Sequence, residues 1–339
     1  MVTAKKYVLR QHYHTWPKTY ELKLVEEELP PLEDGEFLVE AEYLSVDPFM
    51  KAFEPISKIG STFIGTQVAR ITESRNKYFP VGRYVTSCFG WRTHTISNGI
   101  DNGDYPAPVL LPELGKLPVS LGVGILGIPG VTAYFGILDI CQPKKGETMV
   151  ISGASSTVGT IAGQIAKIKG CTVIGITESD EQGEWITNEL GFNYYINQKK
   201  DNLQQLLQKY APNGVDCYFD NVGGTISTRV LNNMNTLGRV AVCGFHQNYS
   251  NEDSMFNFNK APIVQPSIVR KQLRIQGYLV SRYTDWTDAI YQNLMWVQEG
   301  SLKYNELIIE GYHNMFNAFL EMAKDSNTST VIVKVPIGK

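Results

Sequence analysis

The sequence predicts an α/β protein that combines a doubly wound parallel sheet with a second, β-rich domain. From Lys144 onward, short apolar runs alternate with helical patterns, an order typical of right-handed β-α-β crossovers. The first 115 residues instead show strand and turn patterns and little that is helical. A chain of 339 residues also suits two domains better than one small core.

The β-rich part contains an expected strand at 37–44, where apolar and polar side chains alternate, and a second candidate strand at 81–89. Turn signals precede the first of them at Pro30-Pro31. A further strand is expected at 331–335 and is expected to return to this part of the fold. We place the substrate domain at 1–125 and 305–339, and the dinucleotide-binding domain at 126–304.

The second part contains apolar runs that predict a six-stranded parallel sheet covered on both faces. The runs are 148–152, 172–177, 194–197, 215–221, 239–244 and 273–280. The first of them leads into one apolar helix face, formed by Val158, Ile161, Ala162, Ile165 and Ala166. Gly170 is expected to end that helix, and further helices are expected at 203–210 and 227–237.

Composition excludes several classes of protein. Lys and Arg number 31 against 34 Asp and Glu, a formal net charge of −3, so nothing favours a nucleic-acid partner. Five scattered cysteines contain no CxxC pair, which favours a reducing compartment, and we expect the cytoplasm. The N-terminal residues lack the apolar run of a secretory signal.

One uncharged stretch, 117–138, is long enough to be tested as a membrane span. It contains Pro118 and Pro129 together with several glycines, and these residues interrupt helices. We therefore expect a buried, turn-rich connection between the two domains and no membrane partner.

A phosphate-binding turn is expected at 153–159, which reads GASSTVG between the first run and the first helix. Free backbone N–H groups and the positive end of the helix dipole meet at such a turn and favour a pyrophosphate. An ordinary strand-to-helix turn is the alternative, but the order strand, turn, helix, strand favours a Rossmann-type dinucleotide site. Glu178 ends the second run, where a carboxylate accepts hydrogen bonds from ribose hydroxyls; its alternative is a solvated strand end.

With these motifs placed, nearly the whole chain resembles the zinc-independent medium-chain dehydrogenase/reductases. The similarity is greatest to the prostaglandin reductase 1-like family, which includes leukotriene B4 12-hydroxydehydrogenases and alkenal double-bond reductases. The segments that carry it are LSVDPFMK at 44–51, IPGVTAYFG at 128–136, KKGET at 144–148, GQIAK at 163–167, CYFDNVGG at 217–224 and IIEG at 308–311.

The resemblance implies a GroES-like substrate domain and an NAD(P)H-dependent enzyme that reduces the C=C bond of α,β-unsaturated carbonyls. The implied substrates are 2-alkenals, enones and 15-oxoprostaglandin-like lipids. In that reaction hydride reaches the β-carbon and negative charge develops on the carbonyl oxygen, where a hydrogen-bond donor lowers the barrier. The resemblance places this donor at Tyr249, with a ribose hydroxyl of the cofactor as its rival. It also implies a homodimer formed through the dinucleotide-binding domain.

The resemblance assigns cofactor contacts residue by residue. They are Ser156, Thr157, Val158, Gly159, Asn221, Cys243, Gly244, Phe245, Tyr249, Tyr278, Leu279, Val280 and Asn327. At the adenosine end, Gln182 and Gln198 stand where the family has a lysine and a tyrosine against the 2′-phosphate of NADP. With Glu178 added, this end of the site has lost a cation and gained an anion. We therefore expect NADPH, as the family implies, with a weakened preference and NADH as the alternative.

The resemblance also implies that no metal takes part. Leu44, Thr66 and Ile128 occupy the positions where zinc-dependent members carry ligands. Two alternatives to the double-bond reductase stay open. One is a quinone reductase, and the other is a non-catalytic paralogue that binds a ligand or partner, suggested by Ser156, Gln182 and Gln198.

Overall fold

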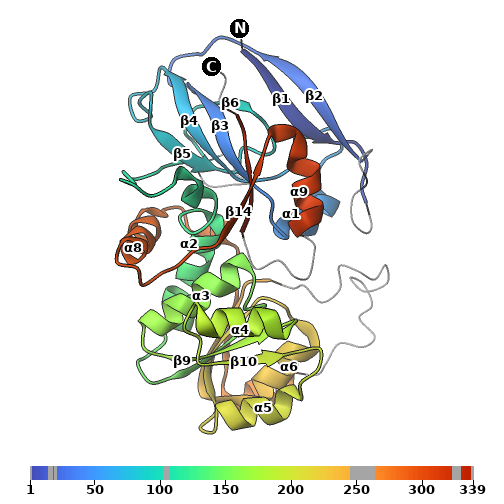
Figure 1. Ribbon diagram of the computed structural model, residues 1–339, viewed down its shortest axis with the longest axis vertical. Coiled ribbons are helices and arrows are strands. Elements are labelled where there is room, and N and C mark those ends of the chain that lie inside the picture. Colours follow the sequence, from blue (N-terminus) through green and yellow to red (C-terminus); the bar gives the residue numbers. More distant parts are fainter. Residues whose placement is uncertain are drawn as a thin grey trace. The chain divides into compact units, whose positions relative to one another are not determined.

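The structure is a computed structural model that describes residues 2–13, 18, 21–101, 107–244, 264–322 and 330–336. Its internal contacts divide the chain into two units (Figure 1). Unit 1 comprises Met1–Ile128, Tyr283–Leu294 and Asn305–Lys339, and unit 2 comprises Pro129–Arg282 and Met295–Tyr304. The predicted combination of a parallel α/β sheet with a separate β-rich part is confirmed.

Unit 1 is built on strands. Its larger sheet has seven strands in the order β14-β15-β3-β4-β5-β7, with β6 paired to β3. These strands are β3 (Phe37–Ser45), β4 (Gln67–Ser74), β5 (Tyr84–Ser87), β6 (His94–Ser97), β7 (Val109–Leu110), β14 (Glu306–Glu310) and β15 (Thr330–Lys334). Strands β1 (Val2–Leu9) and β2 (Leu22–Leu29) form a separate antiparallel pair. Strand β15 pairs with β3, so the expected strand near the C-terminal end does join this sheet.

Short helices complete unit 1. They are α1 (Phe49–Phe53), η1 (Glu54–Ile56), η2 (Val119–Val123), η6 (Tyr312–Asn314) and α9 (Met315–Met322), and α8 (Thr287–Gln298) begins in unit 1 and ends in unit 2. The core is rich in aromatic rings: Phe63 lies edge-on to Trp91 at 4.7 Å between ring centroids, and Phe319 lies 5.8 Å from Trp91. Such edge-to-face pairs are favoured over flat stacks.

Unit 2 contains one parallel sheet of six strands in the order β10-β9-β8-β11-β12-β13. The strands are β8 (Thr148–Ser152), β9 (Thr172–Thr177), β10 (Tyr194–Asn197), β11 (Val215–Asp220), β12 (Met234–Val242) and β13 (Arg274–Gly277). The predicted six-stranded parallel sheet is therefore confirmed.

Helices cover both faces of this sheet. They are α3 (Thr157–Ile168), α4 (Asp180–Asn188), α5 (Leu203–Tyr210), α6 (Gly224–Asn233) and α7 (Gln265–Lys271). Figure 1 shows α3, α4, α5 and α6 near β9 and β10. Ile174 and Ile176 of β9 share a buried cluster with side chains of α5 and α6. Gly175 between them faces Ile186 of α4. Because alternate residues of a strand point to opposite faces, the sheet is doubly wound.

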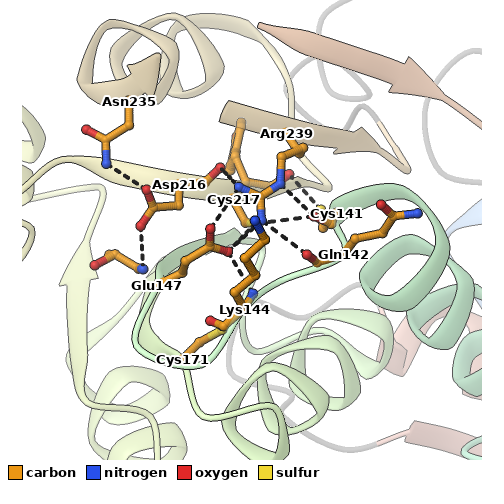
Figure 2. Close-up of polar contacts among 11 residues, drawn as sticks. Cys141, Gln142, Lys144, Glu147, Cys171, Asp216, Cys217, Asn235 and Arg239 are labelled. Carbon is orange, nitrogen blue, oxygen red and sulfur yellow. Dashed lines mark hydrogen bonds and ion pairs between the residues drawn. The ribbon is translucent and has the colours of Figure 1, made fainter. Parts of the chain in front are cut away.

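A half-buried ion pair joins strands of this sheet through a loop (Figure 2). The guanidinium of Arg239 on β12 donates to the Glu147 carboxylate, with Nη1 to Oε1 at 3.1 Å, and its Nε donates to the carbonyl of Cys141 at 2.9 Å. The side chains of Arg239 and Glu147 are only 17% and 19% exposed. The neighbouring Asp216 accepts from the backbone N–H of Thr148 at 2.9 Å. These contacts tie β8, β11 and β12 together.

The expected helix at 227–237 was wrong at its C-terminal end. Helix α6 stops at Asn233, and Met234 already has extended backbone angles and starts β12. The buried residues Val230, Leu231 and Met234 continue the helical spacing, which hid this end in the sequence. In the structure the chain instead pairs Met234 with Val215 of β11.

The stretch 117–138 is largely buried, as expected, but part of it is helical. Helix α2 (Ile128–Phe135) continues into the π-helical turn η3 (Gly136–Cys141). Pro129 lies in the first turn of α2. Backbone N–H groups have no intrahelical acceptor there, so the missing N–H of proline costs no hydrogen bond. Among the described residues, no helix has both the length and the apolar character needed to cross a bilayer.

Candidate active site

The turn between β8 and α3 holds the start of the helix against the end of the strand. Gly153 has φ +59°, a left-handed conformation that glycine adopts without steric cost. A Cβ on Gly159 would lie 2.2 Å from the carbonyl oxygen of Gly153 and 3.0 Å from Cα of Ala154. Glycine at 159 therefore permits the close approach of helix to turn on which a pyrophosphate site depends.

Ser156 replaces the middle glycine of this motif and acts as the N-cap of α3. Its Oγ accepts from the N–H of Gly159 at 3.1 Å and from Nδ2 of Asn221 at 3.0 Å, and it donates to the carbonyl of Gly153 at 2.7 Å. The φ of Ser156 is −70°, so this position does not require glycine. The serine fixes the turn, while the dipole of the following helix favours an anion at this point.

A buried carboxylate, Asp220, orders the neighbouring strand end. Its oxygens accept hydrogen bonds from the hydroxyls of Tyr218 and Ser227, at 2.9 and 2.5 Å, and from the N–H of Gly223 at 2.9 Å. Burial and the charge of Asp220 hold the pKa of Tyr218 well above its usual value, so the phenol stays a donor. Asp220 thereby holds the loop that carries Asn221. The sequence reasoning predicted Asn221 as a cofactor contact but did not identify this role of Asp220.

The loops after β12 and β13 meet beside Asn221 and Asp220. The N–H of Cys243 donates to the carbonyl of Asp220 at 2.8 Å, and a Cβ on Gly244 would lie 2.9 Å from Oδ1 of Asn221. Burial raises the pKa of Cys243 to about 12, against a smaller opposing effect of a hydrogen bond with Tyr278. The thiol is therefore protonated at neutral pH and is no nucleophile.

Tyr278 is anchored within unit 2. Its hydroxyl donates to the carbonyl of Thr132 at 2.7 Å, and its N–H donates to the carbonyl of Val242 at 3.2 Å. Leu279 is exposed, and Val280 begins a short 3-10 helix, η5 (Val280–Arg282). Among the predicted cofactor contacts, Phe245, Tyr249 and Asn327 lie outside the residues that the structure describes.

At the opposite side of the turn, the ends of β9 and β10 carry the predicted adenosine contacts. The side chain of Gln182 accepts from the N–H of Glu178 at 3.0 Å, and the N–H of Gln198 donates to the carbonyl of Thr177 at 2.8 Å. Lys199, which the sequence reasoning missed, places its Nζ 3.1 Å from Oε2 of Glu178. The carboxylate predicted to be an added negative charge is therefore paired with a cation.

These features fit a dinucleotide. Gly159 leaves no room for a Cβ, the tip of α3 favours an anion, and Glu178 follows the second strand of the sheet. All of them lie in unit 2, on elements that the parallel sheet brings to the carboxyl ends of its strands.

Comparisons with known proteins find relatives that cover nearly the whole chain. Residues 5–102 match the family described as the N-terminal domain of oxidoreductase, and residues 157–294 match the family described as zinc-binding dehydrogenase. The chain is 43% identical to prostaglandin reductase 1 of Bos taurus, over 98% of this chain and 100% of that protein. The chain belongs to the prostaglandin reductase family.

Other relatives of this prostaglandin reductase family member extend to bacteria. It is 32% identical to the NADPH-dependent curcumin reductase of Escherichia coli, over 98% of this chain and 96% of that protein. The crystal structure of CurA from Vibrio vulnificus in complex with NADPH superposes with a TM-score of 0.85 at 29% identity, covering 98% of this chain and 100% of that one.

Although one matching family is described as zinc-binding, the ligand positions in this prostaglandin reductase relative hold other side chains. Leu44 is fully buried in the core, and the hydroxyl of Thr66 lies 2.6 Å from the hydroxyl of Ser45. Across the described part of the chain, no group of three or more His, Cys, Asp or Glu side chains is placed to hold a metal ion.

The LSVDPFMK segment that helped to identify the family holds a buried carboxyl group, Asp47. The residue is 5% exposed, and within the described residues its Oδ2 has no hydrogen-bond partner. Burial raises the pKa of Asp47 from 3.8 to about 6, against a smaller lowering effect of Ser45. Between these two values the folded chain binds more protons than the unfolded chain, so this group lowers stability as the pH rises through that window.

Asp47→Asn is therefore expected to stabilise the protein at neutral pH by about 2–3 kcal/mol, since the neutral amide avoids burying an unpaired charge. Urea unfolding at about pH 7 and about pH 4.5 measures the effect, which shrinks at the lower pH because Asp47 is then protonated when folded. Asp34→Asn, at an exposed residue, is the control. A variant that is less stable than wild type at neutral pH would contradict this account.

Proposed function

We propose that the protein is an NADPH-dependent reductase of the C=C bond in α,β-unsaturated aldehydes and ketones. The observation that carries the proposal is the 43% identity to prostaglandin reductase 1 of Bos taurus, over 98% of this chain and 100% of that protein. The relatives named for curcumin and (+)-pulegone support the same chemistry, because both compounds are conjugated enones. The phosphate-binding turn with its glycine at 159 supports the cofactor.

The proposed cofactor contacts divide by the part of NADPH that they hold. Residues 156–159 bind the pyrophosphate at the tip of α3. Glu178, Gln182 and Gln198 line the adenosine ribose, and Asn221 with the loops at 243–249 and 278–280 lines the nicotinamide half, closed by Asn327. When bound, the reduced nicotinamide supplies a hydride to the β-carbon of the substrate.

Tyr249 is the proposed donor to the carbonyl oxygen of the substrate. A phenol aimed at this oxygen stabilises the negative charge that develops there, and this stabilisation acts only as the charge forms. The same hydroxyl would pass to the α-carbon the proton that completes saturation of the bond, with a ribose hydroxyl of the bound cofactor as the alternative donor.

The proposal extends to the organisation of the enzyme. Residues 1–125 and 305–339 form the substrate domain, 126–304 form the dinucleotide-binding domain, and two copies assemble through the latter in the cytoplasm. Strand β13 is one of the two edges of the six-stranded sheet, and an edge strand offers unpaired backbone groups to a second copy. Sedimentation that gives the mass of a single chain would refute the dimer, and cell fractionation tests the compartment.

Turnover tests the activity directly. With NADPH and a 2-alkenal, the purified enzyme is expected to consume NADPH and yield the saturated aldehyde. Tyr249→Phe keeps the ring that lines the cofactor and removes only the hydroxyl, so it is expected to lower kcat by about 10²-fold and to change the NADPH Kd far less. A quinone is the comparison substrate. Faster turnover of the quinone than of any enone would favour the quinone reductase alternative, and absence of NADPH and NADH binding would favour the non-catalytic one.

A further inference from the structure

Two neighbouring strand ends bring opposite charges together at the adenosine side of the site. Glu178 follows β9 directly, and Lys199 lies two residues beyond β10. The Lys199 Nζ is 3.1 Å from Oε2 of Glu178, and the two side chains are 53% and 35% exposed. Because β10 pairs with β9 in parallel register, with Asn197 opposite Thr177, both side chains rise from the same edge of the sheet.

The next lysine along the chain is bound elsewhere. The ammonium of Lys200 pairs with Asp180 in the first turn of α4, and the other oxygen of Asp180 accepts from Nδ2 of Asn197 at 3.1 Å. The hydrogen bonds from Lys200 and Asn197 lower the pKa of Asp180. The two adjacent lysines therefore pair with different carboxylates. Lys200 pairs with Asp180, whereas Lys199 pairs with Glu178, the residue that directly follows β9.

Without Lys199, the side chains around the adenosine ribose would disfavour binding of a 2′-phosphate. Glu178 repels a second anion, and the N-terminus of α4 is already occupied by Asp180 and Glu181 in its first turn. Gln182, whose amide oxygen accepts from the N–H of Glu178, supplies no positive charge. Lys199 neutralises Glu178, and an ammonium with three N–H donors on a flexible stem can contact a carboxylate and a phosphate together.

We infer that Lys199 binds the 2′-phosphate of NADPH and is the residue that makes this chain prefer NADPH to NADH. The inference rests on the proposed use of a nicotinamide cofactor. Glu178 has the opposite role, because it accepts hydrogen bonds from the unphosphorylated ribose. The pair thus acts as a selector in which the cation favours NADPH and the carboxylate favours NADH.

Binding titrations of Lys199→Gln and its matched neighbour Lys200→Gln test the inference without turnover. The probes are NADPH, NADH, and 2′,5′-ADP against 5′-AMP, which isolate the phosphate. Lys199→Gln is expected to weaken NADPH and 2′,5′-ADP by about ten- to hundredfold, while the NADH and 5′-AMP dissociation constants change by less than about threefold. Lys200→Gln is expected to change all four by less than about threefold.

A second variant separates direct contact from neutralisation. Glu178→Gln is expected to tighten NADPH and weaken NADH, and Lys199→Gln added to it should still weaken 2′,5′-ADP by about tenfold or more. Loss of that penalty in the double variant, or equal effects of the two lysine variants, would overturn the inference, provided that thermal unfolding shows folded proteins. A wild-type chain that binds neither cofactor refutes the proposed function and the inference together. NADPH-dependent enone reduction in which Lys199→Gln leaves the KM for NADPH unchanged overturns the inference alone.

Discussion

Gly159→Ala is expected to remove most NADPH binding and to destabilise the dinucleotide-binding unit. The added Cβ would lie 2.2 Å from the Gly153 carbonyl oxygen and 3.0 Å from backbone of Ala154, so α3 must move away from the turn. Overpacking of this kind costs about 1–3 kcal/mol of stability. Displacement of the helix tip also spoils the geometry on which the pyrophosphate depends, so we expect the NADPH Kd to rise by more than about tenfold.

The control for this substitution is Gly277→Ala, since a Cβ at Gly277 has nothing within 4 Å. Urea unfolding gives the stability of both variants, and fluorescence titration gives their affinity for NADPH. If Gly159→Ala bound NADPH as tightly as wild type, the assignment of the pyrophosphate to this turn would be refuted.

Arg239→Met is expected to destabilise the protein by about 2–3 kcal/mol, because it leaves the half-buried Glu147 carboxylate without its charged hydrogen-bond donor. Arg239 and Glu147 are both half-buried, and the guanidinium also donates to the carbonyls of Cys141 and Gln142 (Figure 2). Although burial opposes it, the hydrogen bonds from Arg239 and from the backbone N–H of Lys144 hold the pKa of Glu147 below its usual value. The stabilisation is therefore present at neutral pH and is lost as the pH falls through that lowered pKa.

The matched control is the double variant Arg239→Met with Glu147→Leu, which removes both charges. Replacing a buried pair by apolar side chains is often close to neutral, so we expect it to recover most of the lost stability in urea unfolding. A single variant within about 1 kcal/mol of wild type would show that the pair is as weak as an exposed one.

Three strands of the parallel sheet could be predicted to the residue from the sequence, because each is a short apolar run with polar residues or turns at both ends. The strands observed at Thr148–Ser152, Thr172–Thr177 and Tyr194–Asn197 have the predicted bounds. The end of α6 could not be predicted, because the apolar spacing that signals a helix continues through Met234 into the next strand. Which partner such a residue takes depends on tertiary pairing, in this case with Val215.

Site residues that lie in one short sequence motif could be predicted, whereas contacts that only the folded structure brings together could not. The phosphate-binding turn is contained in one short motif, so Ser156 and Gly159 could be recognised. The partner of Glu178 could not, because Lys199 reaches it from the next strand in the sheet. The donors gathered around Asp220 and the unpaired oxygen of Asp47 likewise depend on packing, which spacing in the sequence does not encode.

Transfer of deuterium from NADPH to a 2-alkenal tests the proposed reaction most directly. With deuterium at the transferable position of the nicotinamide, mass spectrometry is expected to find a saturated aldehyde that carries one deuterium on its β-carbon. An allylic alcohol labelled at the former carbonyl carbon would contradict the account, because hydride would then have reduced the C=O bond.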